Sequence, residues 1–274
     1  MFQPRLSMTL TKKIIGSAPF LYEGSFPEGI AAAHHYGFDC VEINVADPDE
    51  LDLPTLQISL SKHNITVSAL GTGRAYVNDG LSLIDDDLSI RQKAVERLMK
   101  FIDSAAILNC LVIVGCIRGN IPDKAQYDLY ESRLGASMQL ADAHASQKGV
   151  TIVIEPINRY ENNYLCNAYE VSGFIKRYDL LNTKILLDTF HMNIEESDPI
   201  KTIYDNAENI GYIHFADSNR LFPGNGHSDF AAILSALQKC GYSGNISAEC
   251  LPLPTREDAA KGWLTAVNKL LKDM

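Results

Sequence analysis

Short apolar runs recur along the whole chain and alternate with longer segments in which apolar residues are three or four positions apart. The runs are rich in Val, Ile and Leu, and most are uninterrupted by polar residues. Such runs are typical of strands buried on both faces, as in a parallel sheet covered by helices. We therefore predict eight strands, at residues 13–17, 40–45, 66–70, 111–116, 151–155, 184–188, 211–215 and 245–249.

The segments between these runs have the spacing of amphipathic helices. One helix face is indicated by apolar residues three or four positions apart, namely Val95, Leu98, Ile102 and Ala105. The same spacing recurs within residues 134–145 and 264–271. Residues 26–36 and 53–63 give the weakest helical patterns, and Pro54 complicates the start of the second.

Strands that alternate with helices in this way favour an α/β fold, a (β/α)8 TIM barrel. The 274 residues suit it, since such a barrel typically takes about 250 residues. No linker, low-complexity tract or shift in composition divides the chain. We therefore expect residues 1–274 to form a single TIM-barrel domain.

Four ionisable side chains lie at or near the ends of four successive predicted strands. They are Glu155 in TIVIE, Asp188 in KILLD, His214 in GYIHFAD and Glu249 in NISAE. Their spacings of 33, 26 and 35 residues each correspond to one strand–helix unit. Because functional groups of a barrel lie at the carboxyl ends of its strands, we expect all four at one rim.

Three carboxylates that converge on one place repel one another unless something neutralises them, and a divalent cation does so most directly. A set of oxygen ligands with one nitrogen suits Mn²⁺, Co²⁺ or Mg²⁺ better than a sulfur-bound structural zinc, and Zn²⁺ remains an alternative. We therefore expect Glu155, Asp188, His214 and Glu249 to hold one divalent metal ion. Taken singly, each carboxylate has another interpretation as a solvated loop residue, and His214 as a hydrogen-bonded core histidine.

Five further polar residues follow the ends of predicted strands and are candidate substrate contacts. They are Glu161 in EPINRYE, His191 in DTFHMN, Arg220 in HFADSNR, Arg74 in the GTGR turn and Arg118 after the fourth strand. Arginine pairs with carboxylate or phosphate through two parallel hydrogen bonds, so three arginines near one rim suggest an anionic substrate. The alternative is that Arg74 and Arg118 pair with acidic neighbours such as Glu42 or Asp123.

The composition restricts the classes of partner. Lys and Arg number 24 against 34 Asp and Glu, a net charge of −10. Such a chain lacks the basic surface of a non-specific nucleic-acid binder, so we expect no nucleic-acid partner. No apolar run approaches the about 20 residues of a membrane helix, and residues 1–16 lack the pattern of a secretory signal. We therefore expect no membrane partner. Six cysteines without a C-x-x-C pair indicate reduced thiols in a cytoplasmic protein.

The segments EPINRYE, LLDTFHMN, HFADSNRLFPGNGH and ISAE resemble the motifs of the xylose isomerase-like sugar isomerase/epimerase family. Within that family they are most similar to the D-tagatose 3-epimerase and D-psicose 3-epimerase group. The longer string ADSNRLFPGNGHSDF, with GTGR and DGLSL upstream, resembles the 5-keto-L-gluconate epimerase type. This resemblance spans nearly the whole chain and implies a xylose isomerase-like TIM barrel, a small sugar or sugar-acid substrate, and assembly as a homodimer or homotetramer.

Residue by residue, the resemblance implies one divalent metal ion, usually manganese, held by Glu155, Asp188, His214 and Glu249. It assigns Glu155 and Glu249 as the catalytic acid/base pair as well. It further implies that the O1 and O2 region of the sugar is held by Glu161, His191 and Arg220. Arg74 and Arg118 depart from the pattern of enzymes that act on neutral ketohexoses, which favours an anionic sugar.

These residues suit a reaction at a carbon next to a ketone. Removing a proton there requires stabilising an enediolate, which a divalent metal ion does as a Lewis acid. Inverting the carbon requires one group to take the proton and a second to deliver one to the opposite face. We therefore hypothesise an isomerase that catalyses reversible 3-epimerisation of a ketose or keto-sugar acid, with Glu155 and Glu249 flanking the carbon.

Three other functions compete with this hypothesis. An aldose–ketose isomerase for sugars or sugar phosphates uses the same metal and moves a proton between adjacent carbons. Metal-dependent apurinic endonucleases share the fold, but they need further histidines on the early strands, where this chain has GTGR and GCIRG. A non-catalytic sugar-binding barrel has no need for both glutamates and the full ligand set.

Overall fold

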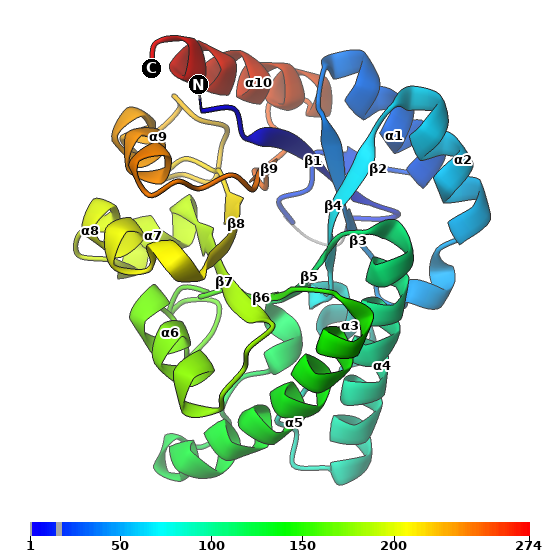
Figure 1. The fold of residues 1–274 in the computed structure, drawn as a ribbon, viewed down its shortest axis with the longest axis vertical. Helices are drawn as coiled ribbons and strands as arrows, with labels where there is room; N and C mark the ends of the chain where they lie inside the picture. Colours follow the sequence, from blue (N-terminus) through cyan, green and yellow to red (C-terminus); the bar gives the residue numbers. More distant parts are fainter. Residues whose placement is uncertain (1, 15–17) are drawn as a thin grey trace.

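A computed structural model describes residues 2–14 and 18–274 of the chain. Within them, eight parallel strands close into a barrel that is surrounded by helices (Figure 1). This confirms the predicted TIM barrel. The strands of the ring are β1 (Arg5–Thr11), β3 (Cys40–Asn44), β4 (Thr66–Gly71), β5 (Leu111–Val114), β6 (Ile152–Ile154), β7 (Thr183–Asp188), β8 (Ile210–His214) and β9 (Asn245–Ala248).

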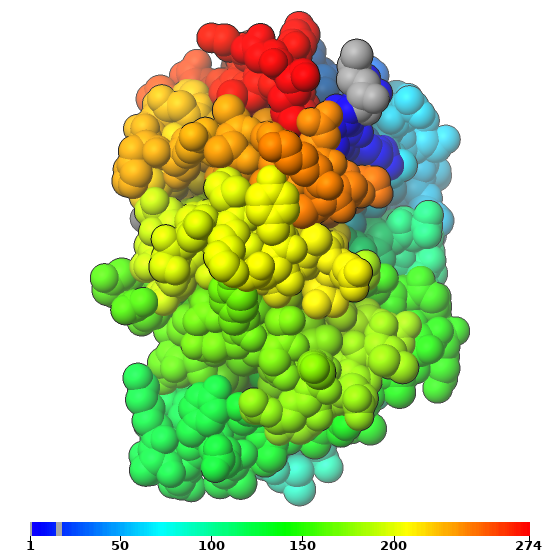
Figure 2. All heavy atoms as spheres, turned by 60° about the vertical axis from the view of Figure 1, so that its left-hand side comes forward, coloured from blue at the N-terminus to red at the C-terminus, as the bar shows by residue number. Residues whose placement is uncertain are grey.

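Neighbouring strands pair in chain order, and the pairing of β1 with β9 closes the ring. A two-residue strand, β2 (Tyr22–Glu23), adds to β1 outside this ring. Figure 2 shows one side of the molecule, where the segments follow one another in chain order from green through yellow to orange.

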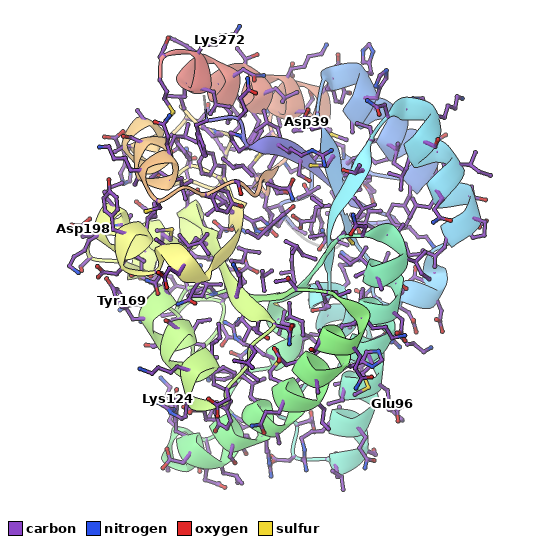
Figure 3. All side chains as sticks on the ribbon, in the orientation of Figure 1. Asp39, Glu96, Lys124, Tyr169, Asp198 and Lys272 are labelled. Carbon is purple, nitrogen blue, oxygen red and sulfur yellow. The ribbon has the colours of Figure 1, made fainter. Side chains whose placement is uncertain are left out.

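Helices follow the strands and cover the outside of the barrel. They are α1 (Phe26–Tyr36), α2 (Leu53–His63), α3 (Gly73–Asp79), α4 (Leu88–Leu108), α5 (Tyr127–Lys148), α6 (Ala168–Arg177), α7 (Thr189–Glu195), α8 (Pro199–Asp205), α9 (Phe230–Lys239) and α10 (Arg256–Lys272), with single 3₁₀ turns η1 (Pro48–Glu50), η2 (Cys116–Arg118), η3 (Lys124–Gln126) and η4 (Ala207–Asn209). Charged side chains such as Glu96, Lys124 and Lys272 lie on the outer perimeter (Figure 3). Among the described residues, no helix combines the length and the apolar character needed to cross a bilayer.

The first strand begins eight residues before the predicted one, so that prediction was wrong. Residues 13–14 belong to no strand, and residues 15–17 of the predicted strand lie outside the described residues. The true strand, RLSMTLT, alternates apolar and polar residues. Its apolar side chains join the core between barrel and helices, whereas Ser7 points into the barrel and lies 2.7 Å from Ser68, Oγ to Oγ. A search for uninterrupted apolar runs misses a strand of this kind.

The two weakest helical patterns form helices with the predicted bounds, α1 and α2. In α2 the Asp52 side chain accepts a hydrogen bond from the backbone N–H of Thr55 at 3.1 Å and so caps the first turn. Pro54 lies in that turn, where its missing N–H has no intrahelical partner to lose. Local capping therefore determines these helices where periodicity is weak.

The barrel interior is filled directly below the rim. A small apolar cluster from five strands lies there, formed by Ala69, Ile113, Val153, Leu186 and Tyr212. Three of its members lie two positions before an ionisable residue. Alternate residues of a strand face the same side. Glu155, Asp188 and His214 therefore also face the barrel interior, at the carboxyl ends of their strands.

Candidate metal centre and active site

The structure brings together the four side chains expected at the rim. One ligand atom from each of Glu155, Asp188, His214 and Glu249 lies within 4.8 Å of the other three. The Nδ1 atom of His214 is 3.5 Å from Glu155 Oε1, 3.7 Å from Asp188 Oδ2 and 3.3 Å from Glu249 Oε2. The first three residues are buried and Glu249 is partly exposed, so the cluster lies at the base of an opening.

Three buried atoms of this cluster have no hydrogen-bond partner among the described residues: Glu155 Oε1, Asp188 Oδ2 and His214 Nδ1. Asp188 Oδ2 has an ion-pair contact with Arg220 at 3.1 Å, whereas the other two have no such contact with a lysine or arginine of the described residues. An unsatisfied buried polar atom costs about 1–3 kcal/mol, so atoms of this kind that face one another indicate a site for a bound group. Two ligands at about 2.1 Å from one cation are about 3.0–3.5 Å apart, close to the separations measured around Nδ1. The donor set of three carboxylates and one imidazole thus fits a divalent metal ion.

Burial and neighbouring charges shift the pKa values of the carboxylates in opposite directions. Burial raises the pKa of Glu249 to about 8, and the negative charge of Glu155 adds to this effect. Burial also opposes ionisation of Asp188, but the positive charge of Arg220 outweighs it, so the pKa of Asp188 lies well below its usual range. Burial thus favours the protonated form of Glu249, and a bound cation would favour its ionised form.

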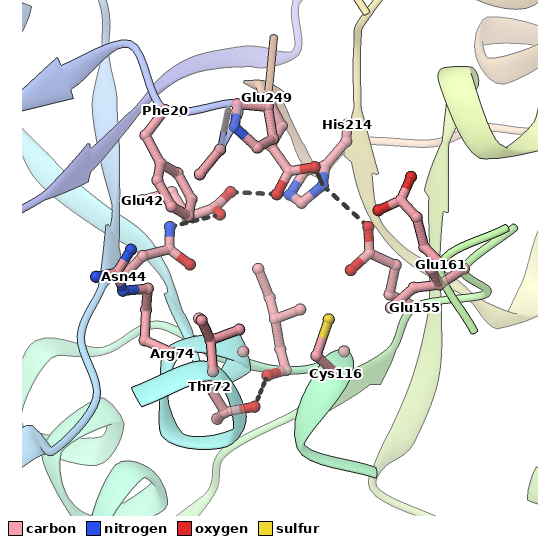
Figure 4. A pocket seen from close by; sticks show the side chains of 18 of the residues that line it. Phe20, Glu42, Asn44, Thr72, Arg74, Cys116, Glu155, Glu161, His214 and Glu249 are labelled. Atoms are coloured by element: carbon pink, nitrogen blue, oxygen red, sulfur yellow. Dashed lines mark hydrogen bonds and ion pairs between the residues drawn. The ribbon is translucent and has the colours of Figure 1, made fainter. Parts of the chain in front are cut away.

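Glu42 contacts the cluster, which the sequence interpretation did not predict. It lies in the middle of β3, fully buried, and its Oε2 is 2.9 Å from Nε2 of His214 (Figure 4). Burial opposes protonation of His214, but the charges of Glu42 and Glu249 raise its pKa well above the usual value. A glutamate inside the apolar run CVEIN was the available signal, because buried acids are rare unless paired.

Arg220 lies at the edge of the cluster. Its guanidinium contacts the Glu249 carboxylate and is 3.1 Å from Asp188 Oδ2. The same group lies over the ring of Phe190, with 4.5 Å between the guanidinium carbon and the ring centre. The two carboxylates and the ring together hold this arginine against the candidate metal centre.

Asn158 links the two other residues expected near the sugar. Its Nδ2 lies 2.7 Å from Nδ1 of His191 and donates a hydrogen bond of 2.9 Å to Oε1 of Glu161. His191 is buried beside the cluster, with Nε2 3.8 Å from Glu155 Oε1, whereas Glu161 is exposed. Both side chains line the same cavity as the cluster.

The other two arginines lie in different environments. Arg74, on α3, is buried, lines the cavity and forms no hydrogen bond or ion pair with a described residue; burial lowers its pKa. Arg118 is fully buried and is not among the residues that line the cavity. Its guanidinium donates to the main-chain carbonyls of Glu155 and Leu165. The structure therefore brings Arg74 to the cavity but not Arg118, and neither pairs with Glu42 or Asp123.

The cavity at the rim has a volume of about 270 Å³, the scale of a small-molecule site rather than of a polymer groove. Glu155 and Glu161 lie on one side and Asn44 and Arg74 on the other, with His214 and Glu249 between them (Figure 4). Thr72 of the GTGR turn also lines the cavity, and residues that the sequence interpretation did not single out complete the wall, among them Phe20, Asn44 and Cys116.

A closed (β/α)8 barrel with a carboxylate–imidazole cluster at the carboxyl ends of its strands defines a class of enzymes with a site able to hold a metal ion. The sequence profile of the xylose isomerase-like TIM barrel matches residues 30–267, and the chain belongs to that family. It is 32% identical to the L-ribulose 3-epimerase of Methylomonas sp. (strain DH-1) over 229 residues, which are 81% of this chain and 77% of that protein.

A second relative is the ketose 3-epimerase of Arthrobacter globiformis, 31% identical over 245 residues that cover 86% of this chain and 82% of that protein. The solved structure of an L-ribulose 3-epimerase superposes with a TM-score of 0.83 at 26% identity and covers 99% of this chain and 95% of that one. These relatives confirm the expectation that the chain is an isomerase of the carbohydrate epimerase class.

Proposed function

We propose that this protein is a divalent-metal-dependent ketose 3-epimerase. The observation that carries the proposal is the cluster of Glu155, Asp188, His214 and Glu249, with three buried atoms that lack any hydrogen-bond partner in the described part of the chain. The names of the two relatives, L-ribulose 3-epimerase and ketose 3-epimerase, support the ketose substrate and the position of the reaction.

The four residues of the cluster are the proposed ligands of one divalent ion. Manganese is the ion proposed first, with cobalt, magnesium and zinc as alternatives for the same donor set. When bound, such an ion supplies positive charge that stabilises the negative charge developing on the ketone oxygen.

Glu155 and Glu249 are the proposed acid/base pair. They follow β6 and β9, which are separated in the ring by β7 and β8, so they approach the cavity from different directions. One carboxylate takes the proton from C3 and the other delivers a proton to the opposite face, which inverts that carbon. The side chains proposed to hold the sugar around its O1 and O2 are Glu161, His191 and Arg220.

We also propose that the substrate is a keto-sugar acid of the 5-keto-L-gluconate kind. Its reacting carbon, C4 in acid numbering, lies next to the C5 ketone and corresponds to C3 of a ketose. Arg74 supports this, because a buried guanidinium without a hydrogen-bond partner in the described residues faces the cavity and can bind a carboxylate in a bidentate manner. Arg118 gives no support, since it does not line the cavity and its two terminal nitrogens donate to main-chain carbonyls. The substrate contact proposed for the acid end is therefore Arg74 alone.

Deuterium exchange tests the acid/base pair. The manganese-loaded protein is incubated with a ketose in deuterated water, and proton NMR follows both loss of the C3 proton signal and appearance of the C3 epimer. We expect Glu155→Gln and Glu249→Gln each to slow epimerisation by about 10²–10⁴-fold. Bound metal is measured in each variant by elemental analysis. Exchange at the normal rate in a metal-loaded Glu249→Gln protein would contradict the mechanism, and an aldose product would indicate the aldose–ketose isomerase instead.

Substrate comparison tests the anionic sugar. Replacing Arg74 by Met removes one charge-assisted pair, which is worth about 1.5–3 kcal/mol, so the KM for a keto-sugar acid should rise by about 10–100-fold. The KM for a neutral ketohexose should not change. Arg256→Met, which removes an exposed charge that pairs with Glu23, is the matched control. An equal effect of Arg74→Met on both sugars would exclude the carboxylate contact.

A further inference from the structure

Glu42 is buried in the barrel interior, where an ionised carboxylate is costly unless both oxygens have partners. Both do. Oε2 is 2.9 Å from Nε2 of His214, and Oε1 accepts a hydrogen bond of 3.1 Å from Nδ2 of Asn44. Glu42 lies 172 residues from His214 in sequence, so only the closed barrel brings the two together.

The two ring nitrogens of His214 face different groups. Nε2 faces Glu42, whereas Nδ1 faces Glu155, Asp188 and Glu249 at 3.3–3.7 Å. A carboxylate accepts and cannot donate, so its hydrogen bond places the proton of a neutral imidazole on Nε2. The lone pair of Nδ1 then points into the cluster.

Asn44 in turn is held by the neighbouring strand. Asn44 and Gly71 are paired residues of β3 and β4, and a Cβ atom added to Gly71 would lie 1.9 Å from Asn44 Oδ1. The asparagine amide therefore packs directly against the glycine backbone, with its Nδ2 directed to Glu42. No larger residue than glycine fits at position 71 without displacing this amide.

We propose that Glu42 and Asn44 are positioning residues that fix the ring orientation and tautomer of His214, and so set the metal affinity of the site. Glu42 acts through His214 rather than as a ligand, as outer partners of metal-bound histidines do. This inference rests on the metal centre of the proposed function. It concerns two residues that are not among the four proposed ligands.

The test measures the manganese affinity of the protein and the tautomer of the His214 ring. Glu42→Gln preserves size but offers one acceptor oxygen to two donors, Nε2–H of His214 and Nδ2 of Asn44. In one arrangement, one of these donors loses its acceptor. In the other, the glutamine amide donates to Nε2, which favours the tautomer with its proton on Nδ1. We expect Mn²⁺ binding, measured by calorimetry, to weaken by about 10–100-fold. In the protein loaded with diamagnetic Zn²⁺, where the ring is neutral and Nδ1 faces the ion, the ¹⁵N chemical shifts of the His214 ring should change.

Asn44→Ala separates positioning from charge, because it removes the hydrogen bond to Glu42 without changing the net charge of the site. We expect it to weaken Mn²⁺ binding and to shift the same ¹⁵N signals, in the same direction and by less. It also provides a second variant should Glu42→Gln fail to fold.

Asp142→Asn is the matched control for replacing a buried carboxylate by its amide. Asp142, on α5, accepts hydrogen bonds from Asn182 and Thr183 and lines no part of the cavity. It should lower the midpoint of denaturation and leave the manganese affinity unchanged. Wild-type affinity and unchanged His214 signals in Glu42→Gln or Asn44→Ala would overturn the inference. A wild-type protein that binds no manganese would instead overturn the metal centre itself.

Discussion

Asp188 uses its two carboxylate oxygens for different purposes. Oδ1 accepts hydrogen bonds from the backbone N–H groups of Phe190 at 2.7 Å and His191 at 3.4 Å, and so caps α7. Oδ2 faces the cluster. The residue that ends β7 therefore starts the next helix and also contributes to the candidate metal centre. The cap fixes the carboxylate plane, so Oδ2 is already aimed before any ion binds.

This division predicts different effects for two substitutions of Asp188. Asn keeps an acceptor for the helix cap but loses the charged ligand atom, so Asp188→Asn should weaken manganese binding by more than about 100-fold, beyond the loss typical of an outer partner. Asp188→Ala should do the same and also destabilise the metal-free protein by about 1 kcal/mol relative to Asp188→Asn, because the cap is lost. Calorimetry and urea denaturation measure the two effects. Equal stability of both variants would contradict the capping role.

The rim residues could be predicted from sequence because each ends an apolar run, and parallel strands end at one face of a barrel. Glu42 could not, since its role depends on closure of the ring between residues far apart in the chain. Arg118 shows the opposite case. It follows a strand, as a rim residue should, but η2 turns its side chain into the protein, where main-chain carbonyls bind it.

The segment that follows β8 is organised around one buried carboxylate. Asp217 accepts hydrogen bonds from the backbone N–H groups of Ser218 at 2.7 Å, Gly224 at 2.8 Å and Ser228 at 3.1 Å. Its carbonyl accepts from the N–H of Arg220 at 2.8 Å, and Arg220 itself has a positive φ of 64°. This uncommon backbone conformation directs the Arg220 side chain toward the cluster, and the hydrogen bonds of Asp217 maintain it.

Asp217→Ala should therefore affect both stability and substrate binding. It leaves backbone donors without an acceptor, which should lower the free energy of unfolding by about 1–3 kcal/mol. Because Arg220 is then less well placed, KM for the sugar should rise more than kcat falls. Asp229→Ala is the control: Asp229 lies in the same segment and caps α9 through the N–H of Ala232 at 2.9 Å. It should cost about 1 kcal/mol and leave KM unchanged. A rise in KM in both variants would show a general effect of loosening this segment.

The elements themselves differ in how far sequence determines them. The seven later strands are each close to their predicted ranges, because each contains a run made mostly of apolar residues. β1 differs, since hydroxyl groups occupy its inward face and hydrogen-bond inside the barrel, as Ser7 does with Ser68 and Thr9 with the carbonyl of Ala248. Such a strand is identified only when the partners of its polar residues are known.

The barrel as a whole carries a cluster of charges that favours binding of a cation. The candidate ligands come from four strands, so an ion bound there connects β6, β7, β8 and β9. An ion that binds only the folded protein stabilises it by about 2.7 kcal/mol at one hundred times its dissociation constant. For a chain of this length that corresponds to a rise in melting temperature of about 5 °C.

Thermal unfolding with and without manganese checks this expectation. The melting temperature should rise on adding the ion and fall back on adding a chelator, and His214→Ala should show neither change. An equal rise in the His214→Ala protein would place the stabilising ion elsewhere.

The ring is closed by the pairing of β1 with β9, the first and last of its strands among the described residues. Thr9 in β1 donates to the carbonyl of Ala248, the last residue of β9, a contact that spans 239 residues. Until β9 has emerged from the ribosome, the edge of β1 that pairs with it has no partner strand. Glu249, which immediately follows β9, arrives with the same strand. A fragment that ends before β9 therefore lacks both the strand that closes the barrel and the fourth candidate ligand, so the barrel and the candidate metal centre can be completed only together.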